Sequence, residues 1–380
     1  MKKKILITHP YLANYSIDFF NEIQKRNIYD LYVLTDIKSD HQLNQITDNK
    51  LLFEVEHIDI SEVGPFVISH SLNKHITKIS PDLIIYLANP RDIGQVFSLL
   101  RMKIKGVKTI AWGMFHRIGG PVLSSTIMFK FISKIADKTM TYSKIGKYYQ
   151  IARNVDPQSV HVLGTAINEK KVLLERSKVS SEMVENFKKD NNLKDKKVLL
   201  QVVRLTAIKK PSFLIETIKN LSETRDDFAL ILIGGGLLEE EIKEKVKQLN
   251  LEKYVQFIGP LYDEKKLSLW FSVADIFIMT TCIGLSAHHA MSYSLPIVTD
   301  NSQQNQASEF DILFDGLNCM LYDEGDKFSF VQKISQVLDD NDLYQLLSTN
   351  AHHTVTDIYT LENKVNNFFK IVDSLTIKNN

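Results

Sequence analysis

The chain has 380 residues, of which 44% are hydrophobic and 24% are charged, and its formal net charge is +1 at pH 7. This length suits two domains of ordinary size, and the composition is that of a globular protein rather than a disordered or fibrous one. A net charge near zero gives no sign of strong polyanion binding by the chain as a whole. Cys282 and Cys319 match no zinc motif and form no secreted disulfide framework, so we expect a reducing, cytoplasmic setting.

The predicted elements begin with short apolar strands in the first half of the chain. Between several of these strands lie longer segments with helical periodicity, at residues 16–26 and 122–137. Strands that alternate with helices predict a parallel, doubly wound sheet. The predicted strands are residues 3–8, 30–36, 82–88, 108–113, 138–143 and 160–164.

The same alternation starts again after a polar stretch at residues 178–197. A final helix at 361–375 carries apolar residues on one face. The fold class is therefore α/β, with two Rossmann-like domains. The second set of strands is predicted at 197–203, 228–234, 255–259, 276–280 and 295–300, with helices at 211–223 and 239–250.

The segment 122–138 admits two interpretations. It carries Lys130, Lys134 and Lys138 together with apolar residues such as Met128 and Phe131. Such a helix either lies on an anionic bilayer or covers the sheet of its own domain, and the second arrangement is the commoner one. No stretch of the chain approaches the roughly 18 apolar residues of a membrane span, so we expect at most peripheral association with a membrane.

Charged residues and glycines follow the predicted strands of the second half. Arg204 and Lys209 come after the strand at 197–203, and a fixed Arg and Lys there would stabilise negative charge on a leaving diphosphate without a metal. Gly235 and Gly236 follow the next strand, where glycine lets the backbone approach a ligand closely. Ligands of open parallel sheets bind at the carboxyl ends of the strands, so these residues predict one site.

Two later segments continue this pattern. Pro260 and Leu261 follow the third strand of the second half. Gly284, Leu285 and Ser286 open a predicted helix, whose unpaired N–H groups and dipole favour an anion. Both segments belong to the same predicted edge of the sheet.

These segments together resemble the donor-binding half of GT-B glycosyltransferases, most closely the retaining family 4 (glycosyl transferases group 1). The resemblance rests on RLTAIKKP, LILIGGG, VQFIGPL, GLSAHHAM and SEFDILFDG, and it covers about residues 195–330 strongly and 1–165 weakly. It implies a GT-B fold of two facing Rossmann-like domains. These would be residues 1–168 for the acceptor, 169–350 for the nucleotide sugar, and 351–380 as a helix that returns to the first domain.

The resemblance also implies roles for the motif residues. Arg204 and Lys209 would hold the diphosphate, and the glycine loop would lie near the nucleotide. Pro260 and Leu261 would lie against the base, mainly through backbone atoms. The helix start at residues 284–286 would bind phosphate.

The sequence departs from the family at two positions. The family usually has Glu, seven residues and a second Glu directly before Ala-Met, and counting back from Ala290 puts Thr281 at the first position and His289 at the second. In the family the first acid contacts the donor sugar and the second holds the ribose hydroxyls. The pattern GLSxxHAMSYxxP resembles a sub-group with His at this place, so we expect His289 to bind ribose and Thr281 to contact the sugar.

Further candidates are Glu309 and His116. Glu309 precedes Asp315-Gly316 and either touches the donor or caps a helix. His116 lies in a Gly-rich loop after the strand at 108–113, where the family often places a histidine near the donor sugar or the acceptor. The Asp-x-Asp of the segment 339–343 is interpreted as a helix cap, so we expect no metal and no cofactor.

The expected function is that of a cytoplasmic glycosyltransferase that moves a sugar from a nucleoside diphosphate sugar to a glycan or lipid-linked acceptor. By the resemblance, this belongs to cell-surface polysaccharide or lipopolysaccharide synthesis and proceeds with retention. No nucleic-acid partner is expected. Two alternatives stay open, namely an inactive homologue that acts as a scaffold and a nucleotide-sugar epimerase of the same architecture.

Overall fold

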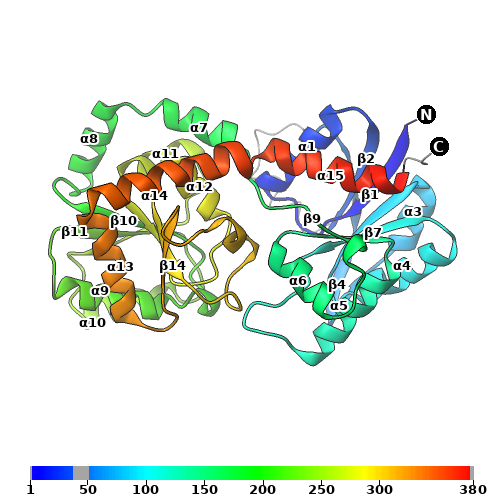
Figure 1. Ribbon diagram of the computed structural model, residues 1–380, viewed down its shortest axis with the longest axis horizontal. Helices are drawn as coiled ribbons and strands as arrows, with labels where there is room; N and C mark the ends of the chain where they lie inside the picture. Colours follow the sequence, from blue (N-terminus) through cyan, green and yellow to red (C-terminus); the bar gives the residue numbers. More distant parts are fainter. Residues whose placement is uncertain (1, 37–50, 377–380) are drawn as a thin grey trace. The chain divides into compact units, whose positions relative to one another are not determined.

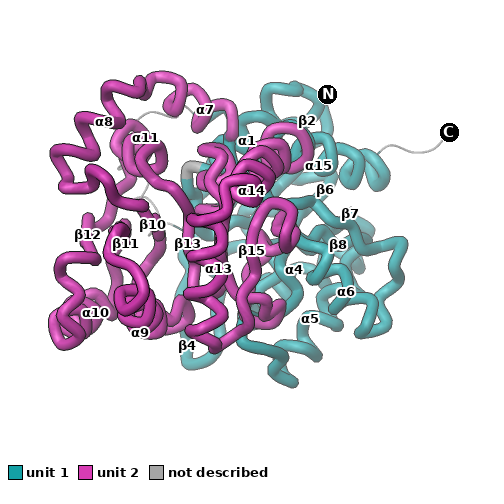
Figure 2. The backbone as a smooth tube through the Cα atoms, turned by 60° about the vertical axis from the view of Figure 1, so that its left-hand side comes forward, with its two compact units in different colours: residues 1–168, 361–380 teal, residues 169–360 magenta. Residues whose placement is uncertain are grey.

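The computed structural model describes residues 2–36 and 51–376. The chain divides into two compact units, and Figure 2 distinguishes them by colour. Unit 1 comprises residues 1–168 and 361–380, and unit 2 comprises residues 169–360.

Unit 1 is built on a parallel sheet with helices on both faces (Figure 1). Its strands are β1 (Lys3–Thr8), β2 (Tyr29–Asp36), β3 (Glu54–Ile58), β6 (Leu83–Leu87), β7 (Lys108–Gly113), β8 (Lys138–Thr141) and β9 (Val160–Val162), in the order β3-β2-β1-β6-β7-β8-β9. Its helices are α1 (Asn14–Lys25), α3 (Leu72–Ile79), α4 (Ile93–Ile104), α5 (Leu123–Ile135), α6 (Lys144–Ala152) and α15 (Leu361–Thr376). An antiparallel hairpin of β4 (Ile60–Val63) and β5 (Phe66–Ser69) packs beside α4.

The central strand β1 shows why this sheet needs helices on both sides. Successive side chains of a strand point to opposite faces. Ile5 and Ile7 join one buried cluster with Phe368 of α15. Leu6 joins the cluster on the other face, with Leu99 of α4. A near-continuous apolar run is the expected signature of a strand that is covered on both faces.

Unit 2 repeats this plan. Its strands are β10 (Lys197–Val202), β11 (Phe228–Ile233), β12 (Val255–Gly259), β13 (Ile276–Ile278), β14 (Ile297–Asp300) and β15 (Cys319–Tyr322), in the order β12-β11-β10-β13-β14-β15. Its helices are α7 (Glu169–Ser177), α8 (Ser181–Asp190), α9 (Pro211–Ser222), α10 (Glu239–Gln248), α11 (Glu264–Val273), α12 (Ser286–Ser292), α13 (Lys327–Asp339) and α14 (Asn341–His353). The strand order reverses beside β10, and such a switch point is where open parallel sheets bind ligands.

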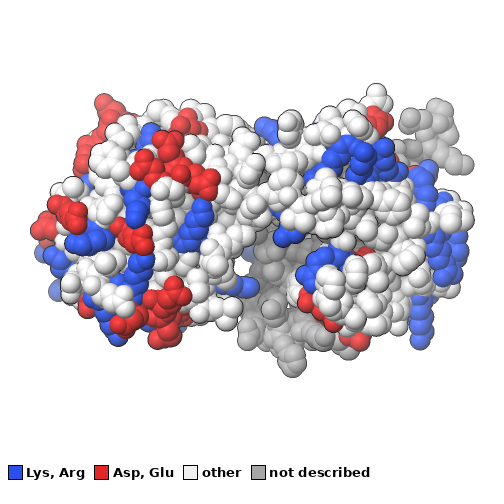
Figure 3. Space-filling model, turned by 90° about the horizontal axis from the view of Figure 1, so that it is seen from below, with Lys and Arg blue, Asp and Glu red and all other residues white. Residues whose placement is uncertain are grey.

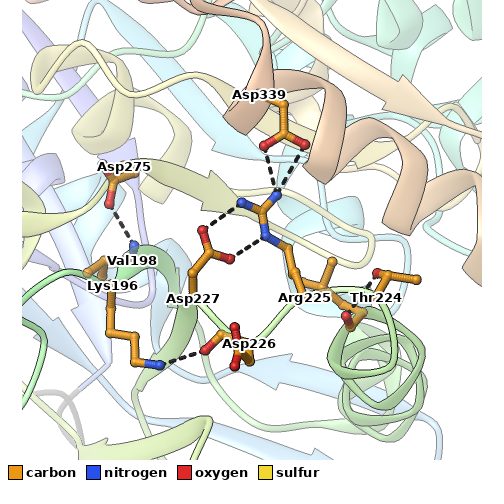
Figure 4. A network of polar contacts seen from close by, with 9 residues as sticks. Lys196, Val198, Thr224, Arg225, Asp226, Asp227, Asp275 and Asp339 are labelled. Atoms are coloured by element: carbon orange, nitrogen blue, oxygen red, sulfur yellow. Dashed lines mark hydrogen bonds and ion pairs between the residues drawn. The ribbon is translucent and has the colours of Figure 1, made fainter.

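At the amino ends of the unit 2 strands, polar groups form contacts with one another (Figure 4). Arg225 donates to both oxygens of Asp227, at 2.7 and 2.9 Å, and also to Asp339 at the end of α13. Asp275, just before β13, accepts a hydrogen bond from the Val198 amide of β10 at 2.6 Å. These groups satisfy one another, which gives this end of the sheet a structural role.

The predicted α/β class and the two doubly wound domains are confirmed. The strands at 3–8, 108–113 and 255–259 have the predicted bounds. The sequence analysis missed β3, the β4–β5 hairpin and β15. It also took residues 178–197 as a polar break, although α8 lies within them.

The domain boundary predicted at 350/351 is corrected to Thr360/Leu361. Helix α14 continues into a π-helical turn at Thr354–Ile358, in which Thr354 and Val355 are buried. The Asn318 side chain donates a hydrogen bond to the Thr354 hydroxyl at 2.9 Å, which holds this turn in unit 2. Just before α14, the carboxylate of Asp340 accepts from the Leu343 amide at 3.0 Å, so the Asp-x-Asp motif is a helix cap.

Candidate functional site

The loops that follow strands β10 to β14 lie at one edge of the unit 2 sheet, because the strands are parallel neighbours. This arrangement brings most of the predicted site residues to the same edge. They are Arg204 and Lys209 after β10, Gly235 and Gly236 after β11, Pro260 and Leu261 after β12, Thr281, Gly284, Leu285, Ser286 and His289 after β13, and Glu309 after β14.

Arg204 and Lys209 differ in their surroundings. Arg204 is exposed and has no hydrogen bond or ion pair within residues 2–36 and 51–376. Lys209 ends a short 3-10 turn, Ala207–Lys209, and its amine donates to the carbonyl oxygen of Cys282. One cation is thus unpaired among the described residues, while the other links the loops after β10 and β13.

The glycine loop after β11 has a structural reason of its own. A Cβ on Gly234 would lie 1.9 Å from the carbonyl oxygen of Val203, and one on Gly236 would lie 2.3 Å from that of Leu205. The Leu205 amide also donates to the Gly235 carbonyl at 2.9 Å. These glycines let the loop lie directly against the backbone of the loop after β10. Their presence therefore does not require a ligand.

The start of α12 has free space around its glycine, which the glycine loop after β11 lacks. A Cβ on Gly284 would have nothing within 4 Å. Helix α12 has only seven residues, so its dipole is small. Phosphate binding by residues 284–286 stays a prediction that depends on their backbone N–H groups.

Thr281 lies in the interior, beside an acid that the sequence analysis missed. Its side chain is 1% exposed and lies close enough to Asp300, at the end of β14, to influence the pKa of that carboxyl. Burial raises the pKa of the Asp300 carboxyl to about 6, although Thr281 and Gln306 both act to lower it. An Asp at the carboxyl end of a predicted strand was the available signal for this residue.

The side chain of Gln306 holds this region together. Its amide nitrogen donates to Asp300 Oδ1 at 2.6 Å and to the Asp300 carbonyl at 3.0 Å. Its oxygen accepts from the Ile283 amide at 2.7 Å. Gln306 thereby joins the end of β14 to the loop that leads into α12.

His289 also lies beside an acid from another element. Its Nε2 is 3.4 Å from Oε1 of Glu264, the first residue of α11, and its ring stacks on Phe271 with centroids 5.8 Å apart. Thr281 and His289, the two positions where the family usually has Glu, therefore each neighbour a carboxylate. A linear motif cannot reveal Glu264, because the pair forms between α11 and α12.

The remaining two predicted residues lie elsewhere in the loops. Glu309 is almost completely buried in the 3-10 turn Ser308–Ile312. His116 belongs to unit 1, whereas the other predicted residues belong to unit 2. Its Nδ1 lies 2.9 Å from the Met114 carbonyl oxygen, and its ring stacks on Tyr149 of α6 with centroids 5.7 Å apart.

Unit 1 has a second histidine at the carboxyl edge of its sheet. His9 follows β1, and its ring contacts Trp112 of β7 with centroids 5.7 Å apart. Burial lowers the pKa of His9 to about 4, so its ring is neutral at pH 7. The sequence analysis did not single out this residue.

Neither a metal cluster nor a membrane-crossing helix is seen in the described part of the chain. Within residues 2–36 and 51–376, no three His, Cys, Asp or Glu side chains are grouped so that they could hold a metal ion. None of the helices there has the length and apolar character that crossing a bilayer requires. The expectation of metal independence stays a prediction.

The chain shows similarity to known glycosyltransferases in sequence. Residues 183–354, most of unit 2, match the model of the family described as glycosyl transferases group 1. An uncharacterized glycosyltransferase of Methanocaldococcus jannaschii is 23% identical over 277 residues, which are 67% of this chain and 65% of that protein. The chain spans 41% to 65% of the length of the curated relatives that it matches.

Solved structures show the same fold over the whole chain. HepE of Anabaena, in complex with UDP, is similar with a TM-score of 0.77 and 14% identity, over 99% of this chain and 100% of that one. A glycosyltransferase from Rickettsia africae has a TM-score of 0.77 and 17% identity, over 100% of both chains. Residues 183–354 are thus similar to the glycosyl transferases group 1 family, and the chain shares the GT-B fold of these solved structures.

Proposed function

We propose that the chain is a glycosyltransferase whose unit 2 binds a nucleoside diphosphate sugar as the donor. The observation that carries this proposal is the position of Arg204 and Lys209. They lie at the carboxyl edge of the sheet, beside its switch point and within the segment that matches glycosyl transferases group 1. HepE of Anabaena, which has the same fold, has been solved with UDP and with UDP-glucose, so UDP is the first nucleotide to test.

The proposed role of the two cations is to stabilise the leaving diphosphate. When the bond between the sugar C1 and the phosphate oxygen breaks, negative charge develops on that oxygen. The exposed Arg204 guanidinium can donate to it directly. Lys209 can exchange the Cys282 carbonyl for a phosphate oxygen, because both are hydrogen-bond acceptors and the phosphate also carries charge.

We further propose that transfer retains the anomeric configuration by a front-side reaction. The acceptor hydroxyl oxygen bonds to C1 on the face that the diphosphate leaves, and its proton passes to the leaving phosphate oxygen. The two acids that neighbour Thr281 and His289 fit this scheme, because neither offers an exposed, unpaired carboxylate as a nucleophile. Asp300 is buried, and Glu264 pairs with His289.

The acceptor in this proposal is a hydroxyl of a glycan or of a lipid-linked intermediate, as in the synthesis of cell-surface polysaccharide or lipopolysaccharide. His116 is the proposed acceptor-side residue of unit 1. Its Nδ1 contact and its stacking on Tyr149 fix the ring orientation.

The test is an incubation of the full chain with UDP-glucose, UDP-galactose, UDP-N-acetylglucosamine and GDP-mannose, followed by NMR of the products. We expect slow release of free sugar and nucleoside diphosphate from one donor, with the sugar first appearing in the donor's own anomeric configuration. Arg204→Ala should abolish the release, whereas Lys219→Ala, which changes a cation on the surface of α9, should not.

Two outcomes would favour the alternatives. Conversion of the donor to an isomeric nucleotide sugar would indicate an epimerase, and a putative UDP-N-acetylglucosamine 2-epimerase of Listeria monocytogenes does have a similar fold, with a TM-score of 0.67. Nucleotide binding with neither release nor conversion, also when glycan acceptors are added, would indicate a scaffold.

A further inference from the structure

The near-zero net charge of the chain hides two oppositely charged units. Unit 1 carries 24 Lys and Arg against 16 Asp and Glu, whereas unit 2 carries 22 against 29. Within unit 1, residues 93–155 contain eleven Lys and Arg and a single acid, Asp137. On the face that Figure 3 shows, Asp and Glu side chains gather on unit 2 and few of them lie on unit 1.

The segment 93–155 forms one side of unit 1. Helices α4, α5 and α6 connect the consecutive strands β6, β7, β8 and β9, so they lie on the same face of the sheet. Helix α4 contacts α5, and α5 contacts α6, as Figures 1 and 2 also show. We call the solvent-facing side of these three helices the α4–α6 face.

Helix α5 has two apolar sides. Phe129 and Ile132 point inward and belong to the core under the sheet. Leu123, Ile127 and Phe131 are spaced by four residues, so they follow one stripe of the helix, and all three are exposed. The segment thus covers its own sheet, as the commoner interpretation expected, and it still presents a separate apolar stripe to solvent.

The neighbouring helices extend this apolar surface. Phe97 and Ile104 of α4 are 69% and 86% exposed, and Tyr148 of α6 is 69% exposed. Single exposed apolar side chains are ordinary on protein surfaces, whereas a contiguous exposed apolar patch marks an interaction site. Leu123, which is 76% exposed, belongs to the same group.

Cations that have no ion pair within residues 2–36 and 51–376 accompany these apolar side chains. Arg101 and Lys105 lie on or directly after α4 and Lys134 lies on α5, and all three are exposed. The one acid, Asp137, is already neutralised, because Lys103 lies 2.6 Å from it and the Thr109 amide donates to it. The α4–α6 face is therefore both apolar and positively charged.

We propose that the α4–α6 face docks unit 1 on an anionic lipid bilayer. Exposed Leu, Ile and Phe side chains can enter the acyl boundary while Lys and Arg contact anionic headgroups. A nucleic acid or another soluble polyanion would use the cations and leave the apolar stripe in water. This inference deepens the proposed function, on which it rests for its purpose, because docking there would bring the enzyme to a lipid-linked acceptor.

The first experiment is sedimentation of the full chain with vesicles of phosphatidylcholine, with and without phosphatidylglycerol, at low and high salt. We expect binding to the anionic vesicles that weakens as salt rises, and little binding to neutral ones. Absence of binding to anionic vesicles at low salt would overturn the proposal.

A pair of variants tests the apolar stripe. Leu123→Ser with Ile127→Ser should lower vesicle binding about tenfold or more, because these side chains lose burial in the acyl boundary. The matched control is Phe328→Ser with Leu346→Ser, which changes two exposed apolar residues of unit 2 and should leave vesicle binding unchanged. Equal binding by both pairs would contradict docking through α5.

A second pair tests the charges. Arg101→Gln with Lys134→Gln should lower binding about fivefold for each charge, which corresponds to about 1 kcal/mol per cation near an anionic surface. Lys189→Gln with Lys194→Gln, on exposed positions of unit 2, is the control. The charge variant could lose vesicle binding while the apolar variant keeps it and is retained on heparin as strongly as the parent chain. That result would identify a soluble polyanion as the partner and overturn the proposal of a bilayer.

The melting temperature with and without UDP is measured for every variant. These residues all belong to unit 1 or lie outside the donor loops, so the nucleotide shift should persist when vesicle binding is lost. A nucleotide shift without vesicle binding refutes the docking face alone. Vesicle binding without any nucleotide shift leaves the docking face standing and counts against the proposed donor site.

Discussion

Unit 1 and unit 2 share one strand order and differ in where their polar chemistry lies. In unit 2 the notable residues gather at the carboxyl edge of the sheet, where loops from five strands meet. In unit 1 the strongest feature is the outer face of α4, α5 and α6. The same architecture thus carries different surfaces, and the function of each unit has to be argued from its own residues.

The largest expected effect is the loss of activity when a cation of unit 2 is removed. Arg204→Ala should lower kcat for donor hydrolysis by about 10²–10³, the usual cost of removing one donor to a developing negative charge. Its melting temperature should match that of the parent chain, because Arg204 is exposed and unpaired within the described residues. Steady-state kinetics with calorimetry provides the check, and an activity within about threefold of the parent would contradict the proposed role.

One buried group in each unit should make the stability depend on pH, and the two dependences should have opposite signs. In unit 1, burial lowers the pKa of His9 from 6.5 to about 4, so this group contributes stability above pH 6.5 that is lost as the pH falls toward 4. In unit 2, burial raises the pKa of Asp300 from 3.8 to about 6, so this group contributes stability below pH 3.8 that is lost as the pH rises through 6. Each shift corresponds to about 3 kcal/mol at most.

Calorimetric melting of the parent, His9→Gln and Asp300→Asn chains between pH 4 and 7 measures these two contributions. The difference between parent and Asp300→Asn should move against the parent as the pH rises, and the difference for His9→Gln should move in its favour. Lys210 and Glu324 also act on Asp300, in opposite directions, and neither is changed in this test. Parallel pH profiles for the two differences would contradict the assignment.

Glycine substitutions distinguish backbone packing from ligand space within unit 2. Gly236→Ala should destabilise unit 2 by about 1–3 kcal/mol, because its Cβ would lie 2.3 Å from the Leu205 carbonyl oxygen. Gly284→Ala should leave stability unchanged, because the corresponding Cβ meets nothing within 4 Å. If Gly284→Ala binds nucleotide more weakly while its stability is unchanged, the added methyl group must interfere with the bound ligand and not with the protein's own packing.

A unit 1 variant completes this comparison. Gly146→Ala places a Cβ 2.5 Å from the Met114 carbonyl oxygen and should destabilise unit 1. It should not alter nucleotide binding by unit 2. Titration calorimetry with UDP is the measurement, and a reduced affinity in Gly146→Ala at a temperature where it is folded would show that the site depends on unit 1.

The smallest effect concerns the acid beside His289. Glu264→Gln should cost less than about 1 kcal/mol of stability, because Glu264 is half exposed and its pair with His289 is partly solvated. We expect its nucleotide affinity to fall several-fold if the His289–Glu264 pair holds the ribose, and 2′-deoxy-UDP should show no such fall. Equal losses for UDP and 2′-deoxy-UDP would assign the pair a purely structural role.

The sequence predicted the features that depend on local pattern. Apolar runs followed by Gly or a charged residue identified the strand ends that carry Arg204, Gly235 and Gly284. It could not reveal Asp300 or Glu264 as neighbours of Thr281 and His289, because each pair forms between elements far apart in the chain.

The apolar side of α5 shows a second limit of the pattern. The sequence left a bilayer and the sheet as alternative surfaces for its apolar residues, and the structure has two apolar sides, of which one faces solvent. The net charge was misleading for a similar reason, since a total of +1 sums a positive and a negative unit. Patterns within one element are visible in a sequence, whereas exposure and the sum of charges over a unit require the fold.

The most direct test of the donor site in unit 2 is a thermal-shift screen of the full chain with UDP, GDP, ADP, TDP and CMP. A ligand at about 100 times its Kd stabilises the folded state by about 2.7 kcal/mol, which gives a clear shift. We predict that one nucleoside diphosphate raises the melting temperature and that the double variant Arg204→Ala, Lys209→Ala loses the shift. A folded parent chain that shows no shift with any of the five, or an equal shift in the double variant, would contradict the account.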